Sequence, residues 1–305
     1  MDTTVFPGHT HSPVTRGLLC TFLGGVCWGF SGACGQYLFS RYGISPELLT
    51  CLRMLISGPI LLIYCLLRKP KAMAAIWKNR RDALHLLAFA ILGLLFCQYT
   101  YLTTISYSNA GTATVIQYIG PVIILGADCV IRRRRPRLRE MTAMLLAILG
   151  TFLLATHGNP GTLVLSTQAL LWGLASAVSM CLYTTLSCGI SNRYGSDVIM
   201  CYGLLIGGAV LALIPGTFSH TVSFGLDGIF AMAGIILVGT ILAYVIFIYG
   251  VSVIGPVRGS LISSIEPVSA TLFAVLWLGS SFTAMDFLGF FCILSTIFLL
   301  AKQHT

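Results

Sequence analysis

The amino-acid sequence predicts an all-α membrane protein with ten transmembrane helices, arranged as two inverted repeats of five. Hydrophobic residues make up 56% of the 305 positions and charged residues 9%, and the mean hydropathy is +0.90, a balance that soluble domains do not show. About 20 apolar residues cross the roughly 30 Å hydrocarbon core, so this length accommodates ten spans with short loops. The apolar runs are too long and continuous for the strands of a membrane barrel.

Ten apolar runs follow one another along the chain, and each is interpreted as one helical span. Short polar or charged segments separate them. Their expected ranges are 17–39, 45–67, 84–106, 109–131, 138–156, 167–190, 197–215, 228–250, 256–279 and 284–301.

The basic residues predict the orientation of these spans. Of 18 Lys and Arg, six follow the second run and six follow the fourth, and 16 in total fall on one side of the expected membrane. The opposite side keeps only Arg41, while Arg53 lies within the second run. By the positive-inside rule, both termini are expected in the cytoplasm. The net charge of +9 therefore needs no nucleic-acid partner, although the cluster at 132–139 offers a second reading as a site for anionic lipid headgroups.

Two short motifs occur twice, which indicates an internal duplication. Arg41-Tyr42-Gly43 returns 152 residues later as Arg193-Tyr194-Gly195, and Pro121-Val122 returns 146 residues later as Pro267-Val268. Five spans is an odd number, so the second copy enters the membrane from the opposite face and the repeat is inverted. We therefore expect an N-terminal cytoplasmic tail at 1–16, a first five-helix repeat at 17–156 and an inverted second repeat at 167–301.

Several segments resemble the EamA-type transporters of the drug/metabolite transporter superfamily, over essentially the whole chain. The resemblance rests on Cys27-Trp28-Gly29, Leu52-Arg53, the segment 105–110 and the Pro-Val pair in each half. Within that family the chain is most similar to uncharacterised enterobacterial inner-membrane EamA permeases, through the segments 150–160 and 278–283. Many members carry Leu-Gly-Glu near the ends of spans four and nine, whereas Leu278-Gly279 is followed here by Ser280, so no role of that glutamate is carried over.

The resemblance implies a basket of ten helices in two inverted repeats. It also implies a central cavity lined mainly by spans one, three, four, six, eight and nine. Members of the family move small polar or amphipathic metabolites, often outward. The resemblance does not select the substrate.

Glu266 is the one acidic residue, of nine, that lies deep within an expected span. A carboxylate at the bilayer centre costs about 3 kcal/mol on insertion scales, so such residues face a cavity or a partner and mark transport pathways. Glu266 is therefore a candidate substrate ligand and a candidate proton-coupling site. The structural alternative is an uncharged acid that bonds to carbonyls freed by Pro267, yet the mirror position, Gly120, carries no acid.

The mirror positions of the two repeats supply the other candidate residues. Ser263 lies on the same face of span nine as Glu266 and corresponds to Gln117. Gln98 corresponds to Tyr244. Tyr183 corresponds to Ser31, three residues after Trp28 on span one. For each of them, interhelical hydrogen bonding or ordinary packing is the alternative. The expected substrate-binding residues are Glu266, Gln117, Gln98, Ser263, Tyr244, Trp28 and Tyr183.

Three further residues have expected mechanical roles. Pro121 and Pro267 are expected to break their helices near mid-membrane, since proline removes a backbone donor. Arg53 lies about nine residues into span two, shallow enough for its side chain to snorkel toward the outer face. We expect it to be an anchor or a gate partner.

These observations predict a secondary transporter, and an exporter, of small metabolites with amino-acid-like or aromatic character. The site is expected at the bilayer midplane between the halves, in a multi-pass protein of the plasma membrane, the inner membrane of a bacterium. Two alternatives remain: a flippase of lipids or lipid-linked sugars with the same fold, which needs a tail-sized apolar groove, and a non-transporting scaffold, which needs no polar cavity. We expect no enzyme activity, cofactor, metal or nucleic-acid partner; the partners are a small-molecule substrate and membrane lipids.

Overall fold

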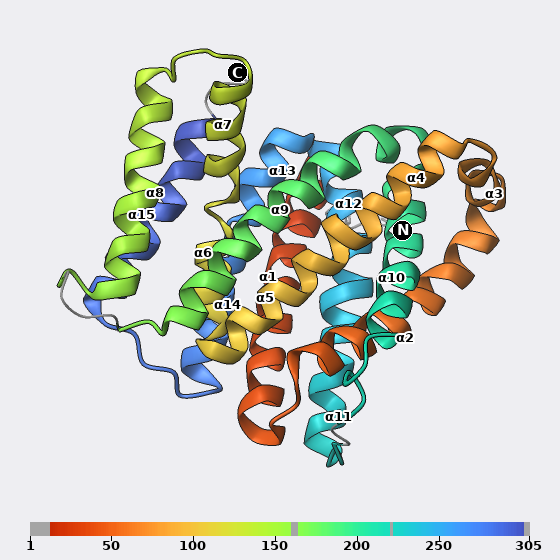
Figure 1. Cartoon of the computed structure of the whole chain (residues 1–305), viewed down its shortest axis with the longest axis horizontal. Helices are drawn as coiled ribbons and strands as arrows, with labels where there is room; N and C mark the ends of the chain where they lie inside the picture. The colour runs from red at the N-terminus through yellow and green to blue at the C-terminus, as the bar shows by residue number, and fades with distance from the viewer. Residues whose placement is uncertain (1–12, 160–163, 220–221, 302–305) are drawn as a thin grey trace, which may run out of the picture.

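The computed structural model of the chain describes residues 13–159, 164–219 and 222–301. Within these ranges every regular element is a helix, and no strand occurs. The helices form one bundle in which α1 and α5 lie near the centre (Figure 1). The expected all-α fold is therefore confirmed, whereas residues 1–12 of the expected tail lie outside the described ranges.

The order of elements in the first half returns in the second half. Each half begins with two long helices, continues with a helix that contains a π-helical segment, then a broken helix, and ends with a single helix. A short helix, α3 (Pro70–Lys78), is an addition of the first half. The remaining elements are α1 (Pro13–Tyr42), α2 (Pro46–Arg68), α4 (Arg80–Ala88), η1 (Phe89–Leu95), α5 (Phe96–Tyr107), α6 (Ala110–Gln117), α7 (Gly120–Ile131) and α8 (Leu138–Thr156), then α9 (Thr167–Tyr194), α10 (Ser196–Ala212), α11 (Leu226–Ala233), η2 (Gly234–Leu242), α12 (Ala243–Ile254), α13 (Pro256–Ser263), α14 (Ile265–Leu276) and α15 (Ala284–Ala301).

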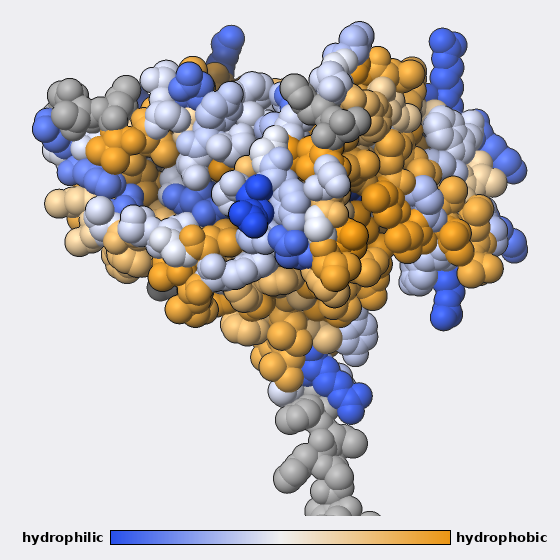
Figure 2. Space-filling view, turned by 90° about the horizontal axis from the view of Figure 1, so that it is seen from below, coloured by the Kyte–Doolittle hydropathy of each residue, from blue (hydrophilic) through white to orange (hydrophobic). Residues whose placement is uncertain are grey.

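Seven helical stretches of the described chain are long and apolar enough to cross a membrane. They are Pro13–Tyr42, Pro46–Arg68, Arg80–Tyr107, Ala110–Ile131, Leu138–Thr156, Thr167–Tyr194 and Leu226–Ile254. Three shorter apolar helices, Ser196–Ala212, Ile265–Leu276 and Ala284–Leu299, fall in the other expected spans. Ten spans and cytoplasmic termini stay predictions. In the face shown in Figure 2, hydrophobic residues cover the lower part and much of the area to the right of the centre, and hydrophilic residues lie near the middle and project from the outer edges.

The main helix contacts join one half to the other. α1 packs against α12 and α14 of the second half, and α9 packs against α5 of the first half. α2 packs against α10, and α8 against α15, so corresponding helices also meet each other. The space between the halves is therefore surrounded by helices from both.

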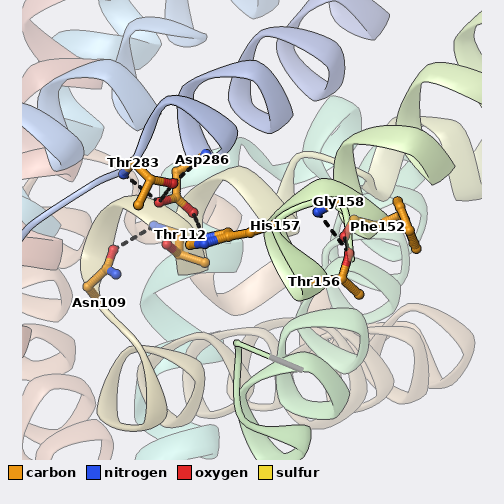
Figure 3. A network of polar contacts seen from close by, with 8 residues as sticks. All are labelled: Asn109, Thr112, Phe152, Thr156, His157, Gly158, Thr283 and Asp286. Atoms are coloured by element: carbon orange, nitrogen blue, oxygen red, sulfur yellow. Dashed lines mark hydrogen bonds and ion pairs between the residues drawn. The ribbon is translucent and has the colours of Figure 1, made fainter. Parts of the chain in front are cut away.

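The pair of α8 and α15 stands at one side of the bundle (Figure 1) and crosses at two glycines. A Cβ atom at Gly150 would lie 2.8 Å from the carbonyl oxygen of Gly289, so only glycine permits this approach. At the end of the pair, the His157 ring lies 3.0 Å from the Asp286 carboxylate. Asp286 also accepts hydrogen bonds from the backbone and hydroxyl groups of Thr283 (Figure 3). These contacts hold the last helix of one half to the last helix of the other.

The second copy of the Arg-Tyr-Gly motif ends α9 and docks on the first half. The Tyr194 hydroxyl donates a 2.8 Å hydrogen bond to the carboxylate of Asp82, in the first turn of α4. The Arg193 guanidinium donates to the same carboxylate at 2.8 Å. Gly195 follows with φ of 93°, a left-handed conformation that glycine adopts without strain. The motif therefore links α9 to α4.

The first copy of the motif ends α1, and this end of α1 docks on the second half through Tyr42 and through Tyr37, which lies outside the motif. The Tyr37 hydroxyl donates a 2.5 Å hydrogen bond to the carboxylate of Asp227, in the first turn of α11. The Tyr42 hydroxyl accepts a 3.1 Å hydrogen bond from the Gly225 amide. The two copies of the motif thus lie at two junctions between the halves, one at each end of the bundle, with different polar contacts.

The arginine cluster between α7 and α8 is partly neutralised within the protein. The guanidinium of Arg134 bonds to Glu140 at 2.8 Å and to Asp128 at 2.9 Å. These hydrogen bonds raise the pKa of Arg134 above its usual value. Arg132 also pairs with Asp128, at 2.6 Å. The cluster therefore offers less unpaired positive charge to lipid headgroups than its composition indicates.

Candidate functional site

A cavity of about 520 Å³ lies between the two halves, and all seven predicted binding residues line it. Each comes from a different helix: α1, α5, α6, α9, α12, α13 and α14. Small-molecule sites are commonly concave, largely apolar and supplied with a few polar groups. The structure therefore brings the predicted residues together, although their binding role stays a prediction. They are Trp28, Gln98, Gln117, Tyr183, Tyr244, Ser263 and Glu266.

Glu266 lies beside the break between α13 and α14. α13 ends at Ser263 and α14 begins at Ile265, so the break comes just before Pro267 rather than at the proline itself. The phenol of Tyr118 reaches across from the other half, with its oxygen 2.9 Å from the carbonyl oxygen of Ser263 and 3.2 Å from a carboxylate oxygen of Glu266. Tyr118 itself lies at the corresponding break, between α6 and α7. The two broken helices therefore meet at this carboxylate.

Glycine allows α1 to touch the same break. A Cβ atom at Gly29 would lie 2.0 Å from the Ser269 hydroxyl and 2.9 Å from the carbonyl oxygen of Glu266. Real Cβ contacts are never this short, so any larger residue must displace the start of α14. The glycines of α1 therefore have a packing role next to the candidate site, which is the role expected of a small-residue helix face.

Gln117, the last residue of α6, supplies an amide to the cavity. Its amide nitrogen donates a 2.8 Å hydrogen bond to the Ser176 hydroxyl of α9 and lies 3.6 Å from the sulfur of Cys97. Gln98 is buried on α5 and also lines the cavity. The interhelical bond of Gln117 fits the structural alternative as well as the binding role, since one amide can fulfil both.

Aromatic rings form one wall of the cavity. The Trp28 ring lies 5.6 Å from that of Tyr244 in an edge-to-face arrangement and 4.7 Å from that of Phe247. The hydroxyls of Tyr244 and Tyr183 lie 3.1 Å apart and hydrogen bond. Such rings offer flat apolar surface together with polar edges, which suits an aromatic or amphipathic ligand.

Arg53 lines the cavity instead of snorkelling to the outer face, so that expectation is wrong. Its residue surface is only 6% exposed, and its guanidinium donates a 2.9 Å hydrogen bond to the Thr240 hydroxyl. A second, longer bond of 3.5 Å reaches the carbonyl oxygen of Gly239. Both acceptors lie in η2, where the π-helical turn changes the hydrogen bonding of the backbone. These two acceptors offset part of the free-energy cost of removing the guanidinium from water.

An arginine and a glutamate thus line one cavity without forming an ion pair with each other. Within the residues that the structure describes, no ion pair joins Arg53 to Glu266. A cation and an anion separated in this way offer partners to the two charged ends of a zwitterion. The same described residues contain no group of three His, Cys, Asp or Glu side chains arranged to hold a metal ion.

The cavity extends toward the end of the bundle that carries the basic residues. Its lining includes Ser196, the first residue of α10, and Ser252, in the last turn of α12. The opposite end is bridged across the halves. There the amide of Gln36 donates to the hydroxyl of Ser280 and accepts from the backbone amide of Ala110, both at 2.8 Å. The end of the bundle near Gln36 is therefore bridged by hydrogen bonds, whereas the end that carries the basic residues is hollowed by the cavity.

Sequence reasoning missed several residues that line this cavity, among them Cys97, Tyr101 and Tyr118. Tyr101 lies three positions after Gln98, on the same helix face, and this spacing was the signal available; Cys97 directly precedes Gln98. Tyr118 lies next to Gln117 and immediately before the helix break, but its mirror residue is a serine. Its contact with the other half follows only from the packing of the two breaks.

Comparisons with known proteins place the chain in a family. The sequence profile described as the EamA-like transporter family matches residues 15–156 and 167–302. A protein of Salmonella typhimurium, named the uncharacterized inner membrane transporter YicL, is 39% identical over 288 residues, which cover 94% of this chain and 95% of that protein. An uncharacterized transporter of Archaeoglobus fulgidus is 25% identical over 67% of this chain and 72% of its own length. One solved crystal structure matches with a TM-score of 0.62 at 20% identity, over 94% of this chain and 97% of its own, a likeness in fold alone.

Proposed function

Because this chain belongs to the EamA-like transporter family and is an integral multi-pass protein of the inner membrane, we propose that it is a secondary transporter of small amino-acid-like or aromatic metabolites. The observation that carries the proposal is the cavity between the halves, which Arg53 and Glu266 enter without pairing with each other. An amino acid presents a carboxylate to the first and an ammonium group to the second. The wall at Trp28 and Tyr244 accommodates an aromatic side chain.

Alternating access is the proposed mechanism, with the five-helix halves 17–156 and 167–301 rocking about the cavity. Because the hollowed end carries the basic residues, the positive-inside rule assigns the structure to a state that is open to the cytoplasm. The bridge from Gln36 to Ser280 closes the outer end and has to separate in the other state. Loading from the cytoplasm fits the proposed direction, which is export.

Glu266 is the proposed site of proton coupling. It is the acidic side chain that enters the cavity at the helix break, where a change of charge acts directly on both halves. A proton that binds here and a substrate ammonium compete for the same carboxylate. Such competition is the simplest way to exchange one for the other across the membrane.

The experiment is a thermal-shift screen of the purified protein against amino acids and related metabolites, followed by transport of the hits in proteoliposomes. A ligand at about 100 times its Kd stabilises the folded state by about 2.7 kcal/mol, which such a screen detects. Glu266→Gln should abolish the dependence of transport on a pH gradient. Glu47→Gln is the matched control, because Glu47 lies outside the cavity and accepts a hydrogen bond from Tyr99. Unchanged coupling in Glu266→Gln would exclude the proposed proton site.

A lipid flippase is the second candidate, and one feature favours it. A groove of about 560 Å³ runs between the helix η1–α5 and the end of α10, lined mainly by apolar side chains that include Leu92 and Phe96, together with Glu47 and Tyr99. Scrambling of fluorescent phospholipids in liposomes tests this function directly. The groove lies on the other side of the helix from Gln98 and the central cavity. The predicted binding residues line the cavity and not the groove, and for this reason we favour the small-molecule transporter.

A further inference from the structure

Tyr118 hydrogen bonds to the backbone at the break between α13 and α14. In a regular helix, the backbone amide of residue 267 would donate to the carbonyl oxygen of Ser263, four positions earlier. Pro267 has no backbone N–H, so it cannot make this bond. The Tyr118 hydroxyl, from the other half of the protein, donates to that same carbonyl at 2.9 Å. Tyr118 thus supplies the hydrogen bond that Pro267 removes.

The same hydroxyl lies within reach of a second acceptor. Its oxygen is 3.2 Å from a carboxylate oxygen of Glu266. A phenol has one proton to donate, so it cannot serve both acceptors fully at once. The charge on Glu266 decides which acceptor is stronger, because a hydrogen bond to an ionised carboxylate is roughly twice as strong as one between neutral groups.

We propose that Tyr118 is a positioning residue that couples the protonation of Glu266 to the geometry of the break between α13 and α14. When Glu266 is protonated, its own O–H donates to the Tyr118 oxygen, and Tyr118 donates to the carbonyl of Ser263. When Glu266 is ionised, Tyr118 turns its proton to the carboxylate, and the carbonyl loses the bond from Tyr118. One proton is taken up or released at Glu266, and no covalent bond other than that O–H changes.

Other titratable groups line the cavity around the Glu266 carboxylate. Arg53 approaches from α2, Cys97 and Tyr101 from α5, and Tyr244 from α12. α1 meets the break through Gly25 and Gly29, which carry no side chain. Among these described neighbours, Tyr118 is the one that hydrogen bonds to the Glu266 carboxylate, and it also reaches the backbone of the break. It also comes from the opposite half, so a turn of this one hydroxyl changes a bond between the two moving bodies.

This inference rests on the proposed function, since it describes how the candidate site responds to a proton, but its primary test requires no transport. Hydrogen–deuterium exchange of the purified full-length protein reports how often backbone amides open to solvent. The amides around the break should open more often when the Ser263 carbonyl loses its bond from Tyr118, because that bond holds the break to the other half. We compare the peptide that covers the break, residues 262–270, at acidic and alkaline pH after correction for the intrinsic exchange rate. The peptide from α8, residues 143–154, is the internal reference.

In the wild-type protein, exchange at the break should be about tenfold faster at alkaline pH than at acidic pH, relative to the reference. Glu266→Gln should show the slow pattern at both pH values, because its amide is neutral throughout. Tyr118→Phe should abolish the difference and leave exchange fast at both. Tyr99→Phe removes a Tyr–Glu hydrogen bond outside the cavity and should behave as wild type.

Two results would overturn the inference. One is exchange at the break that does not depend on pH in the wild-type protein. The other is a Tyr118→Phe protein that stays folded, judged by an unchanged reference peptide, and keeps the wild-type response to pH. A pH response that requires Tyr118, in a protein that transports nothing in proteoliposomes, would support this inference while contradicting the proposed function.

Discussion

The guanidinium of Arg53 on α2 donates a 2.9 Å hydrogen bond to the hydroxyl of Thr240 in η2. The two residues belong to different halves, and both are almost fully buried. A buried arginine needs acceptors for its donors, since an unsatisfied charged group inside a protein is costly. The bond therefore links a charge of the cavity to the π-helical segment of the other half.

We predict that Thr240→Val lowers both stability and transport. Valine keeps the shape of threonine but removes the acceptor, which should cost about 1–3 kcal/mol of unfolding free energy. Without this acceptor, the arginine is no longer held in one orientation toward the substrate. Thermal unfolding in detergent and proteoliposome uptake measure the two effects.

The control for this change is Thr104→Val. Thr104 is also fully buried, but its hydroxyl donates only to the carbonyl oxygen of Thr100 within the same helix. Its loss should therefore change transport little. If Thr104→Val and Thr240→Val reduce transport equally, Arg53 is not positioned by Thr240.

Gly29→Ala should displace α14 from α1 and abolish transport. The added methyl group would meet the Ser269 hydroxyl and the backbone of the break at distances that no Cβ atom tolerates. Overpacking of this kind costs about 1–3 kcal/mol. The measurement is substrate binding and melting temperature, compared with Gly189→Ala. No atom lies within 4 Å of the corresponding methyl position at Gly189, so that control should be neutral or slightly stabilising, and a harmful effect there would contradict the packing argument.

Cys97 should be labelled by a membrane-impermeant thiol reagent from the side of the basic loops only. It lines the cavity, and the cavity extends to that end of the bundle. A protein that retains Cys97 as its sole cysteine, labelled in right-side-out and inverted vesicles, provides the measurement. Cys51, which is fully buried and hydrogen bonded to the carbonyl of Gly208, is the matched site and should remain unreactive. Faster labelling of Cys97 from the outer side would contradict a cytoplasm-open state.

Asp82→Ala should destabilise the protein more than Asp197→Ala does. Asp82 is buried and accepts hydrogen bonds from Arg193 and Tyr194, so its loss should cost about 1–3 kcal/mol, with Tyr194 supplying the larger share because Arg193 is mainly in solvent. Asp197 pairs with the half-exposed Lys69, and such a pair contributes below about 1 kcal/mol. Unfolding temperatures of the two variants, measured in one detergent, test the order. Equal values would show that the junction at the Arg-Tyr-Gly motif carries no special stability.

Hydropathy and the position of charges can be read from the chain without knowledge of its contacts, and for this reason much of the helical fold was predictable. Lipid contact forces apolar runs into helices, and the position of Lys and Arg relative to those runs predicts their direction. The repeat of Pro121 at Pro267 indicated broken helices, and the depth of Glu266 marked the candidate site. Neither argument needs to know which helices touch.

What the sequence by itself determined about this protein is therefore its helical membrane character, its duplication and a set of candidate side chains for a site between the halves. Only the tertiary structure decided where those side chains point. Arg53 could turn along its helix toward the outer face or toward the bundle, and the acceptor at Thr240, distant in sequence, decides for the bundle. Tyr118 meets Ser263 and Glu266 because two breaks pack together. Hydropathy depends on one residue at a time, whereas a hydrogen bond between the halves depends on the relative position of both.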